Sequence, residues 1–257
     1  MKIIKLYSIY PDIYLDAYKG VKNYREKLSK ELYEKTGGLV KLDYTFVDWG
    51  LGSVEIAFDE AVNTLPILEK VKWAEKNGYD AVIIDCMDDP GLTAAKELVN
   101  ISVTGALESS THLASMIGGT FSILSVIPEA NHHLREKIRS YGLEGNLASI
   151  RSIGIPVLEL EKDLKKTAKA ATEAAEKAIV EDGAGAIILG CTGMAELARE
   201  IENNLKERGY DVRVIDPLQA AIYTAIAMVL MGVKQSKAVF PKPKEKPRKL
   251  LPGMKLF

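Results

Sequence analysis

The sequence has little of the residues that build disulfide and metal sites. Its 257 residues include two cysteines and three histidines. The cysteines, Cys86 and Cys191, lie 105 positions apart, which excludes a disulfide scaffold and the zinc sites built from paired cysteines. Three histidines leave little material for a metal cage. Since the chain also lacks a Walker A motif and a dinucleotide-binding fingerprint, we expect no metal and no other cofactor.

The chain also lacks an excess of positive charge and a long apolar run. It carries 34 Lys and Arg against 35 Asp and Glu, a balance that gives no support to a nucleic-acid partner. The longest apolar stretch, 220–233, is shorter than the roughly 20 residues that span a bilayer. The N-terminal residues lack the apolar segment of a signal peptide. We therefore expect a cytoplasmic protein with reduced thiols and no membrane partner.

What the sequence does contain is an alternation of short β-branched runs and longer helical patterns, which is typical of a parallel α/β sheet. The runs 81–84 and 186–189 are apolar throughout, as expected for strands whose sheet is covered by helices on both faces. Residues 164–182 predict an exposed amphipathic helix. The expected strands are 2–8, 39–47, 81–85, 101–103, 120–125, 148–153, 186–189 and 212–215.

An internal duplication predicts how these strands are organised. Residues 81–86 (Ala-Val-Ile-Ile-Asp-Cys) match residues 186–191 (Ala-Ile-Ile-Leu-Gly-Cys). Ser-Ile-Tyr-Pro at 8–11 recurs as Ser-Val-Ile-Pro at 125–128. We therefore expect an α/β fold of two pseudo-symmetric parallel-sheet lobes, with the active site in the cleft between them.

The boundaries of the lobes follow from the same repeat. The first lobe is expected at 1–106 plus 217–240, and the second at 107–216. Residues 241–257 form a basic, Pro-rich tail in which each Pro blocks a helix. Its composition favours a solvated segment, with a docking arm for a neighbouring subunit as the alternative. We expect a homo-oligomer.

Both cysteines end a buried strand of the predicted sheets. Ligands of such sheets bind beyond the carboxyl ends of the strands, and a nearby helix N-terminus can lower the pKa of a thiol. Two thiols on facing lobes suit proton transfer at one carbon: a thiolate removes the proton, and the other thiol returns one from the opposite side. A free Cys in an apolar strand is usually a small core residue. The equivalent placement of Cys86 and Cys191 favours a functional role for the pair.

The residues around the cysteines are the candidates for binding a small-molecule substrate. Backbone N–H groups of Thr192 and Gly193 could stabilise an enolate. Asp-Pro-Gly at 89–91 predicts a turn and a helix start, so Asp88 and Asp89 could instead be plain helix caps. His132 and His133 are expected on the surface, and a cleft role for His112 stays open. The candidate substrate-binding residues are Ser8, Met87, Asp88, Thr192 and Gly193.

The chain resembles the aspartate/glutamate/hydantoin racemase superfamily, most of all its hydantoin and allantoin racemase branch. The motifs that carry this resemblance are Cys-Met-Asp-Asp-Pro-Gly-Leu at 86–92, Ile-Pro-Val-Leu-Glu-Leu at 155–160, Leu-Gly-Cys-Thr-Gly-Met at 189–194 and Val-Ile-Asp-Pro at 214–217. The resemblance implies a cofactor-independent racemase in which Cys86 and Cys191 are the acid and base.

Two short segments bear on the substrate. Superfamily members that act on free acidic amino acids have Asn-Thr after the first Cys, which holds the substrate carboxylate. Met87 and Asp88 stand there in this chain and are poor partners for a carboxylate, which favours a neutral ring or amide, such as a 5-substituted hydantoin or allantoin. The hydantoin branch usually has Asn-Pro-Asn in its first-strand loop, where this chain has Ser-Ile-Tyr-Pro at 8–11.

Other functions stay open at this point. Within the same fold, the alternatives are racemisation of aspartate or glutamate, and isomerisation or decarboxylation of a dicarboxylic acid. In a different class, the chain could be a non-catalytic small-molecule binding protein or a thiol redox sensor. A sensor needs thiols that readily form a disulfide, whereas a racemase needs thiols that a substrate carbon separates.

Overall fold

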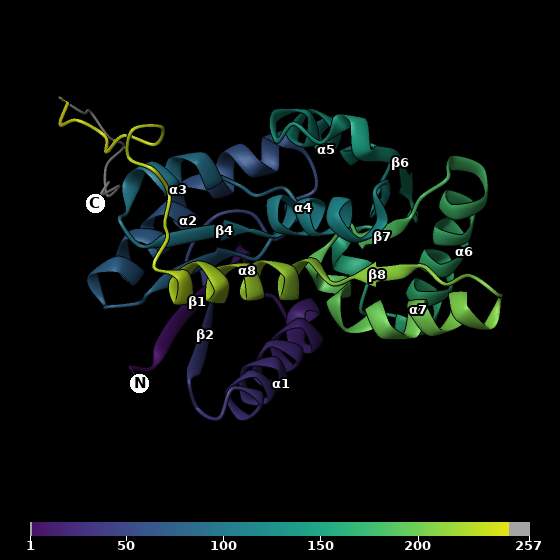
Figure 1. The fold of residues 1–257 in the computed structure, drawn as a ribbon, viewed down its shortest axis with the longest axis horizontal. Helices are drawn as coiled ribbons and strands as arrows, with labels where there is room; N and C mark the ends of the chain where they lie inside the picture. The colour runs from purple at the N-terminus through teal and green to yellow at the C-terminus, as the bar shows by residue number, and fades with distance from the viewer. Residues whose placement is uncertain (1, 247–257) are drawn as a thin grey trace.

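Two four-stranded parallel sheets, one in each half of the chain, form the framework of the molecule (Figure 1). The computed structural model describes residues 2–246. Part of the expected tail, 247–257, therefore lies outside the described residues. The first sheet contains β1 (Ile4–Ile13), β2 (Val40–Val47), β3 (Ala81–Ile84) and β4 (Ser102–Gly105). The second contains β5 (Phe121–Ser125), β6 (Leu147–Ser152), β7 (Ala186–Leu189) and β8 (Arg213–Ile215).

The two sheets share one topology. The strand order is β2-β1-β3-β4 in the first and β6-β5-β7-β8 in the second, so each half places its strands in the order second, first, third, fourth. This confirms the expected α/β fold with two similar lobes. The helices are α1 (Lys19–Lys35), α2 (Ala57–Lys76), α3 (Leu92–Leu98), α4 (Ala106–Gly118), α5 (Ala130–Ser140), α6 (Leu164–Asp182), α7 (Ala198–Glu207) and α8 (Pro217–Met231).

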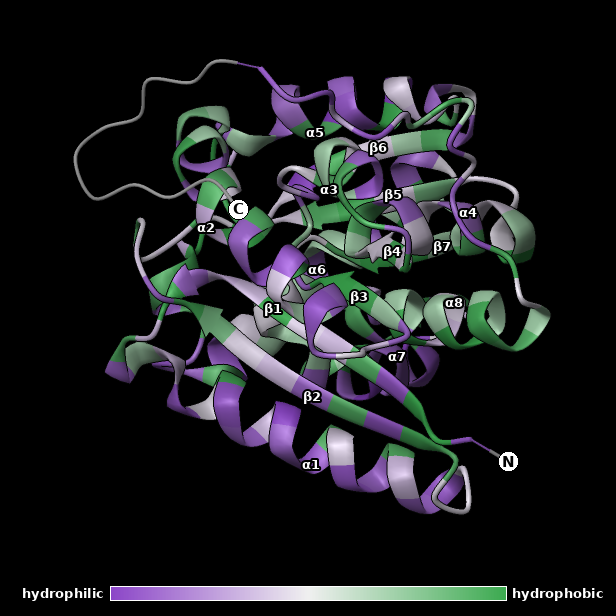
Figure 2. Ribbon diagram, turned by 90° about the vertical axis from the view of Figure 1, so that its left-hand side faces the viewer, coloured by the Kyte–Doolittle hydropathy of each residue, from purple (hydrophilic) through white to green (hydrophobic). Residues whose placement is uncertain are grey.

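Helices cover both faces of each sheet, which explains the wholly apolar strands. In the first sheet, α1 and α8 bury Leu28 and Ile222 against one face, while α2 and α3 bury Val71 and Ala95 against the other. In the second sheet, α6 and α7 cover one face, and α4 and α5 cover the other. Figure 2 shows β3 as largely hydrophobic and β2 as mixed, whereas α1 and α5 carry many hydrophilic residues. Within residues 2–246, no helix has the length and apolar character needed to cross a membrane.

All eight expected strands are present, and seven of them start and end within two residues of their predicted positions. The prediction for the first strand is wrong at its end: β1 continues to Ile13 instead of stopping at Ser8. Tyr10 still pairs with Phe46 of β2, and the register shifts between Tyr10 and Ile13. Pro11 lies in this irregularity, where a missing N–H is tolerated. Pro11 is therefore contained in the strand.

Candidate active site

Both cysteines line one cavity, although they come from different sheets. Cys86 follows β3 and Cys191 follows β7, each two residues beyond its strand. The cavity has a volume of about 30 Å³ and lies between the lobes, at the carboxyl ends of the strands. The first half contributes Tyr10, Pro11, Asp12, Val54, Glu55, Asp85, Cys86, Met87 and Asp88. The second half contributes Val126, Ala130, Leu134, Val157, Gly190, Cys191 and Thr192.

Each thiol accepts a hydrogen bond from the backbone two residues further on. The N–H of Asp88 donates to Cys86 Sγ at 3.5 Å, and the N–H of Gly193 donates to Cys191 Sγ at 3.3 Å. Such a donor favours the charged form of the sulfur. The expectation that the Gly193 N–H stabilises an enolate is not what the structure shows, because this N–H points at the thiol. Gly193 therefore holds a cysteine in place.

Burial dominates the acidity of both thiols. It raises the pKa of Cys86 well above the usual value, and the nearby carboxyl groups of Asp88 and Asp12 raise it further. Burial also raises the pKa of Cys191, to about 12, although the Gly193 N–H and the Arg25 guanidinium lower it. The expected lowering by a helix N-terminus is thus outweighed, because a narrow cavity removes the water that would solvate a thiolate.

A buried ion pair connects the two cysteine loops. Arg25 of α1 and Asp85 are 2 % and 1 % exposed, and Arg25 donates to both carboxylate oxygens of Asp85, at 3.0 and 2.9 Å. Arg25 also donates to the carbonyl oxygen of Thr192 at 3.1 Å. The Thr192 hydroxyl donates to the carbonyl oxygen of Asp85, also at 3.1 Å. Because Asp85 precedes Cys86 and Thr192 follows Cys191, these bonds fix one cysteine loop against the other.

Ser8 does not line the cavity. It is buried inside β1, and its hydroxyl donates to Asp85 at 3.2 Å. Since β1 runs past Ser8, the residues that reach the carboxyl end of this strand are Tyr10, Pro11 and Asp12. Ser8 therefore binds to the Asp85 side of the buried ion pair. It does not lie at the cavity, where we expected it as a substrate-binding residue.

Two carboxyl groups at the cavity escaped the sequence interpretation. Asp12 accepts hydrogen bonds from the Tyr18 hydroxyl at 2.9 Å and from Asn63 at 3.3 Å, and burial raises its pKa to about 7. Glu55 accepts a hydrogen bond from the N–H of Val157 at 2.5 Å, which joins the two lobes across the cavity. The position of Asp12 at the carboxyl end of the first strand could have identified it, had the strand end been placed correctly.

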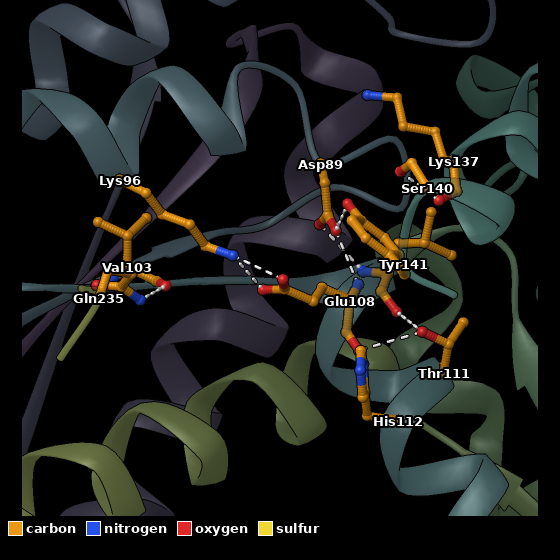
Figure 3. Close-up of polar contacts among 11 residues, drawn as sticks. Asp89, Lys96, Val103, Glu108, Thr111, His112, Lys137, Ser140, Tyr141 and Gln235 are labelled. Carbon is orange, nitrogen blue, oxygen red and sulfur yellow. Dashed lines mark hydrogen bonds and ion pairs between the residues drawn. The ribbon is translucent and has the colours of Figure 1, made fainter. Parts of the chain in front are cut away.

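The two aspartates after Cys86 have different roles. Asp89 accepts hydrogen bonds from the N–H groups of Leu107 and Glu108, at 3.0 and 2.7 Å, and thereby caps α4 (Figure 3). The Tyr141 hydroxyl donates to Asp89 as well, at 2.8 Å. Asp88 lines the cavity instead, together with the buried Met87. Neither side chain caps α3, the helix that follows Asp-Pro-Gly, because Gly91 is its N-cap residue; Asp89 caps α4 instead.

The histidines lie away from the thiols. His112 is exposed and lines a separate groove on α4, and His132 is exposed as expected. The prediction for His133 is wrong: its ring is partly buried between the lobes and contacts Glu60 of α2 at 2.7 Å. Lys137 donates to the same carboxylate. Among residues 2–246, no group of three His, Cys, Asp or Glu side chains is placed to hold a metal ion.

Comparison with known proteins gives consistent results. Residues 23–225 match the family described as Asp/Glu/Hydantoin racemase. The chain is 40% identical over 199 residues to the hydantoin racemase of Paenarthrobacter aurescens, covering 77% of this chain and 82% of that one. It is 38% identical over 188 residues to the hydantoin racemase of Pseudomonas sp. strain NS671, covering 73% and 74%. The structure of an allantoin racemase from Klebsiella pneumoniae is similar, with a TM-score of 0.85, 30% identity and 96% of each chain covered.

Proposed function

The chain belongs to the Asp/Glu/hydantoin racemase family of isomerases, and from this premise we propose that it racemises hydantoins by moving a proton between Cys86 and Cys191. The observation that supports this most is the placement of the two thiols. They stand at equivalent ends of two similar sheets and line one cavity between the lobes.

In this proposal, one thiolate removes the proton from the ring carbon beside the carbonyl. The electron pair of the C–H bond passes into the enolate, and the opposite thiol then gives its proton to the other face of that carbon. The product is the enantiomer, and the two sulfurs have exchanged protonation states. Proton exchange with solvent restores the starting state. The backbone N–H groups of Asp88 and Gly193 stabilise the thiolate form in turn.

The charge of the cavity favours a neutral ring over a free dicarboxylic amino acid. Asp12, Glu55 and Asp88 face it, and an anionic substrate would be repelled by them. Arg25 is the nearby cation, but its guanidinium is already paired with Asp85. Hydantoin and allantoin carry no ionised carboxylate.

The test follows the loss of optical rotation with single enantiomers of a small set of hydantoins, allantoin among them. D- and L-aspartate and glutamate serve as comparison substrates. We expect racemisation of hydantoins and none of the amino acids, with full activity after dialysis against a chelator. Racemisation of the amino acids alone would overturn the proposed substrate class. Activity that returns only on adding a metal or organic cofactor would overturn the proposed two-thiol reaction.

The cytoplasmic location and the homo-oligomeric state remain predictions. Light scattering of the purified protein tests the second: a mass of one chain, about 28.2 kDa, contradicts it.

A further inference from the structure

Asp88 is a buried carboxylate on the cleft wall whose oxygens have no protein partner. The residue is 6% exposed, and within residues 2–246 no donor lies within hydrogen-bond distance of its carboxylate oxygens. Among residues 2–246, every side-chain oxygen that is fully shielded from solvent has a hydrogen-bond partner. The Asp88 carboxylate oxygens have none, so they are not fully shielded and must border an open space. Asp88 is one of the residues that line the cavity between Cys86 and Cys191, and we take this cavity to be the space that its carboxylate borders.

The other carboxylates of the cleft are all engaged by the protein. Asp12 accepts hydrogen bonds from Tyr18 and Asn63, Asp85 is paired with Arg25, and Glu55 accepts one from Val157. A buried carboxylate without donors is unfavourable, since it loses its hydration and gains no hydrogen bond in return. Such a group in a binding cleft therefore calls for a donor from the ligand.

The cations near Asp88 do not supply this donor. Lys137 donates to the carbonyl oxygen of Asp88 at 2.7 Å and to the carboxylate of Glu60. His133 also directs its Nε2 at Glu60. Lys137 thus binds Glu60 and the Asp88 carbonyl oxygen, His133 contacts Glu60, and the carboxylate of Asp88 stays free for the cavity.

The backbone of Asp88 places this carboxylate close to the reaction. Its N–H bonds to Cys86 Sγ, so a group that reaches the Asp88 carboxylate is attached to, or lies next to, the carbon that Cys86 faces. Building on the hydantoin racemase function, we propose that Asp88 selects substrates by accepting a hydrogen bond from an N–H group on the substituent of the reacting ring carbon. Ureido and amino substituents fit this description. Alkyl substituents leave the carboxylate unpaired, and a carboxylate substituent is repelled.

The test compares the wild type with Asp88→Ala and Asp88→Asn on three hydantoins, whose reacting carbon carries a ureido, a butyl or a carboxyethyl group. The selectivity is the ratio of kcat/KM for the ureido compound to that for the butyl compound. Glu129→Gln is the matched control, because Glu129 is an exposed carboxylate outside the cavity. It removes the same charge.

We expect the wild type to prefer the ureido compound and to act least on the carboxyethyl compound. The ratio should fall at least tenfold in Asp88→Ala, mainly through KM, and less in Asp88→Asn, which keeps the size and one acceptor oxygen. Glu129→Gln should leave the ratio unchanged. If both Asp88 variants slow the ureido and butyl compounds equally, the proposed selectivity is wrong while the hydantoin racemase function stands. If the wild type racemises none of the three, the proposed function is overturned and this inference with it.

Discussion

The two halves of the chain share one topology but build opposite walls of the cleft. The residues that the first half contributes include four carboxylates, namely Asp12, Glu55, Asp85 and Asp88. The residues from the second half carry no charge: they are apolar apart from Gly190, Cys191 and Thr192. The repeat in the fold therefore sets where the cysteines lie, and the side chains around them make the two positions chemically different.

The cysteines themselves show the same difference. Cys191 is the N-cap of the short 3-10 helix Thr192–Leu197, and the Arg25 guanidinium lowers its pKa. Cys86 precedes a turn, with α3 beginning six residues later, and the Asp88 carboxyl raises its pKa. A helix N-terminus and a cation both stabilise a thiolate. We infer that Cys191 is the thiol that ionises more readily, and that Cys86 holds its proton more tightly.

Removing one thiol at a time should have the largest effect and tests the difference between Cys86 and Cys191 directly. Cys86→Ser and Cys191→Ser should each lower the racemisation rate by at least about 100-fold, since each loses the acid or base of one face. In D₂O, each variant should still exchange the α-proton of one enantiomer, and the two variants should act on opposite enantiomers. Proton NMR of each enantiomer measures this exchange.

The difference in acidity between Cys86 and Cys191 adds a second expectation to the same experiment. Cys86→Ser keeps the thiol that ionises more readily, so its residual exchange should be faster than that of Cys191→Ser. The wild type, which exchanges both enantiomers, is the control. Two variants that exchange the same enantiomer at similar rates would contradict the assignment of one thiol to each face.

Arg25 is the next place to test, because its positive charge lowers the pKa of Cys191. Arg25→Met leaves Asp85 buried without its cation, with only the Ser8 hydroxyl as a side-chain donor, which should cost about 3–5 kcal/mol of unfolding free energy. Arg25→Met combined with Asp85→Asn removes both charges and should recover much of this loss. Urea unfolding measures it. Lys27→Met, an exposed change on the same helix, is the control.

Activity separates the positioning role of Arg25 from a purely structural one. In the stable double variant, kcat should fall and the pH at which activity rises should move slightly upward, because Arg25 lowers the pKa of Cys191 more than Asp85 raises it. A double variant with wild-type kcat and an unchanged pH profile would show that the ion pair serves folding alone.

How much of the fold and of the candidate site could be predicted from the sequence depends on the kind of feature. Seven of the strands and the placement of both cysteines at one cavity were predicted correctly, because buried apolar runs and a duplicated motif leave local signals. Arg25 leaves no such signal: one Arg in a helical pattern normally indicates an exposed residue, and only the fold brings it to Asp85. Ser8 was misplaced because the first strand was expected to end at residue 8, whereas β1 continues to Ile13. Contacts between distant segments need the three-dimensional structure.

The pH dependence of stability tests the acidic wall. Burial raises the pKa of Asp12 from 3.8 to about 7, so the folded chain holds this proton to a higher pH than the unfolded chain does. Stability should therefore fall as the pH rises from about 4 to 7. Asp12→Asn should remove this contribution and stabilise the protein by about 4 kcal/mol at pH 8, with little gain at pH 4. Urea unfolding at several pH values measures it, and an equal gain at pH 4 and pH 8 would contradict the charge argument.

The smallest expected effects come from two serines that occupy matching positions in the halves. The Ser8 hydroxyl donates to Asp85, whereas the Ser125 hydroxyl donates to Asn131 at 2.5 Å, so only the first supports a cysteine loop. Ser8→Ala and Ser125→Ala should each cost about 1 kcal/mol of unfolding free energy, the usual loss for one hydrogen bond. Ser8→Ala alone should lower kcat, and by no more than a few-fold, because Arg25 still holds Asp85 with two bonds. If Ser125→Ala lowers kcat as much as Ser8→Ala does, both serines support the active site. The proposed difference between the two halves would then be wrong for these residues.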